Sequence, residues 1–71
     1  MARHDDIYKG FRYIVDTIAA GDGRFGWQTV VDGKRPIIGP PCPTEADAMA
    51  AGIEAAQAKI ESVLDGYRKP R

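Results

Sequence analysis

Apolar residues recur at helical spacing in one stretch of this chain, between Thr44 and Tyr67. Thr44 is predicted to cap the helix, because Asp47 follows three residues later and both Glu45 and Asp47 favour the positive end of a helix dipole. Gly66 is predicted as the residue that ends the helix. A single helix buries one apolar stripe, so the preceding residues must form the surface that covers it. The stripe comprises Ala46, Met49, Ala50, Ile53, Ala56, Ile60, Val63, Leu64 and Tyr67.

Two runs rich in aromatic and β-branched residues precede this helix and predict strands, one over Phe11–Ile18 and one over Arg24–Val31. Gly21-Asp22-Gly23 separates them with residues that tolerate positive φ. Asp32-Gly33 then indicates a hairpin, because a type I′ turn needs positive φ at both central positions.

A third strand is predicted from Lys34 to Gly39. Pro36 lacks an N–H, which places this strand at the sheet edge. Pro40-Pro41-Cys42-Pro43 is expected to end it. The expected fold is therefore α+β: a three-stranded antiparallel β-meander of order 1-2-3 with one C-terminal helix on one face. Residues 1–6 are expected to be flexible, residues 7–67 to form the single β-β-β-α domain, and residues 68–71 to form a basic tail.

Size and charge narrow the classes of function. A chain of 71 residues makes one domain and buries only about 60–65% of its unfolded surface, which leaves little room for a catalytic cleft. Ten basic residues balance ten acidic ones, whereas a dedicated nucleic-acid domain usually carries a basic excess. The N-terminus has no apolar signal region and no stretch suits a bilayer span, so cytoplasmic residence is expected.

The turn lengths predict a register. A two-residue turn at Asp32-Gly33 places Trp27 opposite Ile38, and the loop after Ala20 places Thr17 opposite Trp27. Both registers put the aromatic residues on one face, which is expected to pack on the helix. The predicted core comprises Val15, Trp27, Ile38, Ile53 and Ile60.

The opposite face is predicted to bind a partner, because one helix cannot cover both faces. A contiguous apolar patch ringed by arginine is typical of an interface. The predicted partner- or nucleic-acid-binding residues are Arg12, Ile14, Ile18, Arg24, Gln28, Val30, Arg35 and Ile37.

No residues are predicted to be catalytic, to ligate a metal or to bind a cofactor. The only histidine, His4, lies near the N-terminus, and the only cysteine, Cys42, has no placed base and no disulfide partner. The glycine pattern from Gly21 to Gly26 lies inside a hairpin, not between a strand and a helix, so it is not a dinucleotide fingerprint.

Two families share short motifs with this chain. The segments Trp27–Gly39 and Thr44–Ala48 resemble the AP2-like and integrase amino-terminal DNA-binding domains, which read DNA with the exposed sheet face. The span Phe11–Gly66 resembles HicB-type antitoxins in the order of its elements, with Pro40-Pro41-Cys42-Pro43 in place of their "PGC" motif. The order β-β-β-α is also similar to that of small uncharacterised bacterial proteins.

The expected function is a non-enzymatic protein-interaction module, with self-association into a homodimer as one form. DNA binding through the same face is the alternative, with Arg12, Arg24, Lys34 and Arg35 as a local basic surface and the tail from Arg68 to Arg71 adding phosphate contacts. Neither a membrane nor a small-molecule substrate is implied.

Overall fold

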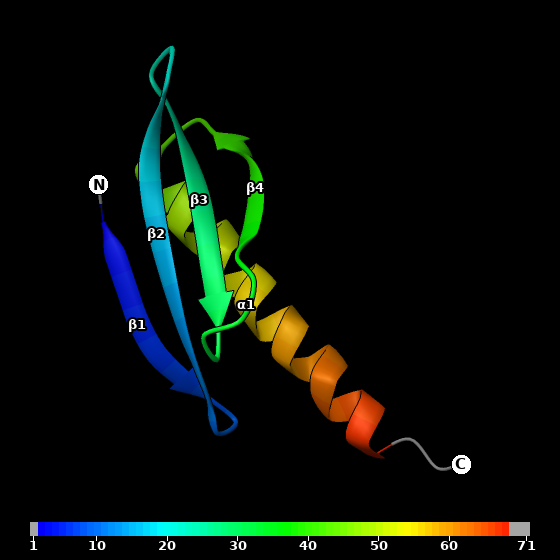
Figure 1. Cartoon of the computed structure of the whole chain (residues 1–71). Coiled ribbons are helices and arrows are strands. Elements are labelled where there is room, and N and C mark those ends of the chain that lie inside the picture. Colours follow the sequence, from blue (N-terminus) through cyan, green and yellow to red (C-terminus); the bar gives the residue numbers. More distant parts are fainter. Residues whose placement is uncertain (1, 69–71) are drawn as a thin grey trace.

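The computed structural model describes residues 2–68 and, beyond residue 66, only the backbone. Four strands form one antiparallel sheet of order β1-β2-β3-β4. A single helix, α1, follows the strands and crosses one face of the sheet, and its C-terminal end extends away from the sheet (Figure 1). This confirms an α+β fold with an antiparallel sheet and one C-terminal helix. The elements are β1 (Arg3–Tyr8), β2 (Phe11–Gly21), β3 (Arg24–Val31), β4 (Ile37–Cys42) and α1 (Glu45–Arg68).

The predicted number of strands is wrong, because residues that were expected to be flexible form β1. This strand pairs with β2 along its whole length, from Arg3 opposite Asp16 to Tyr8 opposite Phe11. Lys9 and Gly10 join the two strands with φ values of 51° and 86°. The charged sequence of β1 has low β-propensity, so composition alone did not indicate a strand. At a sheet edge, charged side chains are common because they discourage pairing with other chains.

The predicted register of β4 is also wrong, by one residue. Trp27 lies opposite Gly39, and Ile38 lies opposite Gln28. Lys34 still donates its N–H to the carbonyl of Val31 at 3.0 Å, but the strand begins only after Pro36, which has no N–H for the ladder. This one-residue change turns Ile38 away from the helix, where it is 73% exposed.

The edge strand β4 also runs further than predicted. It continues through Pro40 and Pro41 to Cys42, with a register shift opposite Gly26. Both prolines are tolerated because β4 has a neighbour on one side only. Gly39 is required in this register, since a Cβ atom there would overlap the indole of Trp27.

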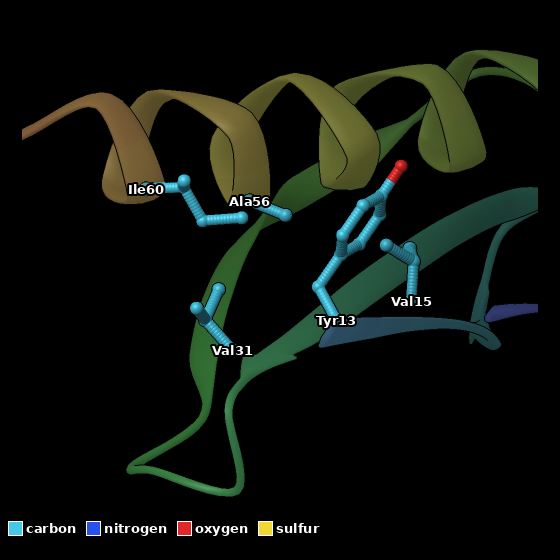
Figure 2. Packing of buried hydrophobic residues seen from close by; sticks show 5 residues of the cluster. All are labelled: Tyr13, Val15, Val31, Ala56 and Ile60. Atoms are coloured by element: carbon cyan, nitrogen blue, oxygen red, sulfur yellow. The ribbon is translucent and has the colours of Figure 1, made fainter. Parts of the chain in front are cut away.

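The core lies between α1 and the aromatic face of the sheet, as predicted. Tyr13, Val15 and Val31 point from the sheet toward Ala56 and Ile60 of the helix (Figure 2). Trp27 is buried on the same side, opposite Thr17 as predicted. Of the five predicted core residues, Val15, Trp27 and Ile60 are buried. Ile53 is partly buried and packs against the core, and Ile38 is exposed.

Polar contacts cap α1 and join it to the sheet at two places. The hydroxyl of Thr44 accepts the N–H of Asp47 at 3.0 Å, which confirms the predicted cap, and the hydroxyl of Thr17 donates to Glu45 at 3.0 Å. Toward the C-terminal end, Glu61 accepts hydrogen bonds from Tyr8 at 2.7 Å and Lys9 at 2.6 Å. Gly66 does not end the helix, which continues to Arg68.

Gly52 lies where α1 packs closely on the sheet. It is buried, and a Cβ atom there would overlap Val15 and approach Trp27. We predict that Gly52→Ala destabilises the fold by about 1–3 kcal/mol, because overpacking outweighs the better helix propensity of alanine. Urea unfolding followed by circular dichroism measures this change.

Gly66 provides the matched control in the same helix, since no atom would lie within 4 Å of an added Cβ. Gly66→Ala should stabilise the protein by up to about 1 kcal/mol. Equal gains in stability for the two variants would show that α1 does not pack closely at Gly52.

Candidate functional site

The sheet face that points away from α1 has no covering element among residues 2–68, and we call it the open face. Strand pairing places its side chains in rows, because residues directly opposite each other project to the same side. One row joins Asp5, Ile14 and Val30, and the next joins Arg3, Asp16, Gln28 and Ile38. The open face comprises Arg3, Asp5, Ile7, Arg12, Ile14, Asp16, Ile18, Gln28, Val30 and Ile38.

Five of the ten residues on the open face are aliphatic. Ile14 and Val30 lie opposite each other on the two central strands and are half-buried. Three isoleucines stand further out, with Ile7 66%, Ile18 48% and Ile38 73% exposed. Ile7 lies toward one end of the face and Ile18 and Ile38 toward the other, with Ile14 and Val30 between them. Exposed large aliphatic groups on one sheet face are typical of an interaction surface.

The open face is hollowed beside its central pair. A depression of about 230 Å³ is lined by Arg12, Ile14, Val30, Asp32 and Gly33. It lies where the β3–β4 turn rises beside Arg12, whose carbonyl accepts the N–H of Asp32 at 2.7 Å. An aliphatic side chain of a partner would find apolar contacts at the floor and charged groups at the rim.

Two ion pairs neutralise the β1 side of the open face. The guanidinium of Arg3 donates to both carboxylate oxygens of Asp16, at 2.7 and 3.2 Å. Arg12 donates to both oxygens of Asp5, at 3.3 and 3.0 Å. These hydrogen bonds raise the pKa of each arginine and lower the pKa of Asp5. The two arginines are therefore held by carboxylates of the chain itself.

The structure divides the predicted binding residues into two groups. Arg12, Ile14, Ile18, Gln28 and Val30 share the open face, as predicted. The other three residues lie outside this group. Arg24 is on the same side of β3 as Gln28 and Val30 by strand alternation, but it lies at the hairpin end of the strand, opposite Gly21. Ile37 lies opposite the buried Thr29 and so faces the helix, and Arg35 lies in the loop that precedes it.

Sequence reasoning missed four members of the open face. Arg3, Asp5 and Ile7 belong to β1, which was not predicted, and Ile38 was placed on the helix side. Gly10, which readily adopts positive φ, stands just before a strong strand, and it was the one signal for the β1–β2 hairpin. Lys9 seldom adopts positive φ and did not point to a turn.

Other chemical groups do not assemble into a site in the part of the chain that the structure describes. No group of three or more His, Cys, Asp or Glu residues that could hold a metal occurs there. His4 lies with its ring 5.8 Å from that of Tyr13, and Cys42 is half-buried with its Sγ 3.8 Å from the carbonyl of Pro40. Within residues 2–68, α1 lacks the apolar character that a helix needs to cross a bilayer.

The Asp5–Arg12 pair predicts an acid-dependent contribution to stability. Because the hydrogen bond from Arg12 lowers the folded-state pKa of Asp5 below 3.8, the stabilisation is present above the unfolded-state pKa and is lost as pH falls through the folded-state value. Carbon-detected NMR titration should show the pKa of Asp5 returning toward 3.8 in Arg12→Gln. In the control variant Arg24→Gln the pKa of Asp5 should stay low. An unchanged pKa of Asp5 in Arg12→Gln would contradict the pairing of Asp5 with Arg12.

Comparison of this chain with protein-family models, with curated proteins and with solved structures gives no match.

Proposed function

We propose that this protein is a non-enzymatic interaction module that self-associates through its open face. The observation that carries the proposal is the combination of exposed isoleucines with a hollow floored by Ile14 and Val30 on one face. Ile7, Ile18 and Ile38 would each leave water on association. At about 25 cal/mol per Å² of apolar surface, their burial supplies the driving force, and lost translational freedom and polar desolvation oppose it.

A second copy of the chain is the partner that suits this face best. A two-fold interface brings the same surface of both subunits together, so projections and hollows must occur on that one surface. The open face has both, since the depression beside Val30 lies toward one end of the face, next to Ile7, and the exposed Ile18 and Ile38 project toward the other end. Isoleucine from one protomer would enter the depression of its partner.

The charges of the open face are compatible with its own copy. Arg3 and Arg12 are balanced by Asp16 and Asp5, each pair at hydrogen-bond distance. Apart from Arg24 at the hairpin end of β3, these pairs leave no excess of either sign that would repel an identical face. Both pairs lie on the β1 side, where they would form a polar rim beside the apolar centre.

Face-to-face packing is favoured over pairing at the sheet edges. One edge, β4, contains Pro40 and Pro41, and the other, β1, is rich in charged residues. Two open faces would pack about 10 Å apart, as in a β-sandwich, with the helices on the outside. A standard interface takes about 800 Å² from each partner, which is a modest share of the 4930 Å² that the chain exposes.

DNA binding through the same face is the second function that the sequence suggests, and the positions of the cations do not favour it. Arg12 is held by Asp5, and Lys34 and Arg35 line a pocket against the helix. Arg24 lies at the opposite end of β3 from Arg12, Lys34 and Arg35. The expected basic surface is thus divided among three places, whereas phosphate binding needs cations on one face.

We predict that the molecular mass rises from monomer to dimer with concentration in sedimentation equilibrium. Val30→Asp should abolish the dimer, because it places a carboxylate at the centre of the apolar contact. Ala58→Asp, at an exposed position on α1, is the matched control and should dimerise like the wild type. Circular dichroism of all three proteins establishes that the fold is intact.

Two results would overturn the proposal. A monomer at millimolar concentration would exclude self-association, and an unchanged dimer in Val30→Asp would place the interface elsewhere. Titration with duplex and single-stranded oligonucleotides tests the DNA alternative. It is done at low salt, because contacts to phosphate are strongest at low salt.

A further inference from the structure

A second hollow lies on the helix side of the sheet, between the β3–β4 loop and α1. Its volume is about 230 Å³, and a shallower depression of about 450 Å³ shares four of its residues. Phe11, Val31, Ile37 and Val63 provide an apolar lining, and the polar groups are Asp32, Lys34, Arg35 and Lys59. We call this hollow the cationic pocket.

The cationic pocket exists because β4 begins late. The last pair between β3 and β4 is Thr29 with Ile37, so Val31 has no partner on β4. The intervening residues leave the ladder at Pro36 and form a wall beside the helix. Lys59 and Val63, four residues apart on α1, lie on the same helix face and form the opposite wall.

The charges of this pocket are not balanced by side chains of residues 2–66. Lys34, Arg35 and Lys59 give three positive charges against one negative charge from Asp32. None of these three cations forms an ion pair with a described residue, whereas Arg3, Lys9 and Arg12 each have a carboxylate partner. Positive charge that is left without a counter-charge around an apolar hollow favours an anionic ligand.

We infer that the cationic pocket binds a small amphipathic anion: a carboxylate or phosphate group on a short aliphatic or aromatic body. The anionic group lies among Lys34, Arg35 and Lys59, and the apolar body contacts Phe11, Ile37 and Val63. A cavity of about 150 Å³ holds benzene, so this pocket suits a body of that size or slightly larger. The inference does not rest on self-association, because the pocket opens on the helix side of the sheet and shares only the turn residue Asp32 with the depression on the open face.

Octanoate is a suitable probe, and titration of the ¹⁵N-labelled protein by NMR reports where it binds. We expect saturable shifts of the backbone amides of Lys34, Ile37 and Lys59. Octanol tests the need for the charge and inorganic phosphate tests the need for the apolar body, and both should bind at least about tenfold more weakly. Equal binding of octanol or phosphate would overturn the inference, as would octanoate shifts confined to the open face.

Lys59→Gln removes one charge at an exposed helix position and keeps good helix propensity. It should weaken octanoate binding about tenfold, while Arg24→Gln, which removes a charge far from the pocket, should leave binding unchanged. Unaltered affinity in Lys59→Gln, with the fold intact, would contradict the proposed role of the cations. Sedimentation equilibrium tests the dimer and octanoate titration tests the pocket, so a failure of either proposal can be told from a failure of the other.

Discussion

The close packing of α1 against β2 and β3 is the contact on which the rest of this structure depends. Gly52 allows the helix backbone to approach Val15 and Trp27, and the side chains of Tyr13, Val31, Ala56 and Ile60 complete the buried layer. One helix covers one face of a sheet. The same contact that stabilises the fold therefore leaves the other face exposed, and the candidate interaction surface is a direct consequence of the core.

The position of Trp27 determines the register of β4 and thereby both candidate sites. The indole leaves no room for a side chain on the opposing residue, and Gly39 is the residue that lies there. This register directs Ile38 to the open face and Ile37 to the helix side. It also leaves the residues before Ile37 outside the ladder, where Lys34 and Arg35 come to face Lys59 across an apolar hollow.

The N-terminal strand changes the character of the open face. Without β1, Arg12 and Asp16 would stand as separate charges in water. With β1 in place, Asp5 and Arg3 lie within hydrogen-bond distance of them, and the face becomes neutral on that side. A surface whose charges are paired and whose other side chains are mostly aliphatic favours association with protein over binding to a polyanion, because little counterion release is available to drive polyanion binding.

The sequence by itself determined the helix, the two central strands and the faces of those strands. These features depend on local signals: the helical stripe after Thr44, the alternation about Tyr13 and Val15, and the positive φ values required at Asp32-Gly33. Five of the eight predicted binding residues share the open face for the same reason. Only the tertiary structure decided the pairing of β1, the register of β4 and the gathering of Lys34, Arg35 and Lys59. A charged edge strand has no strong propensity of its own, a one-residue shift reverses every side chain of a strand, and cations separated by more than twenty residues in sequence meet only when the chain is folded.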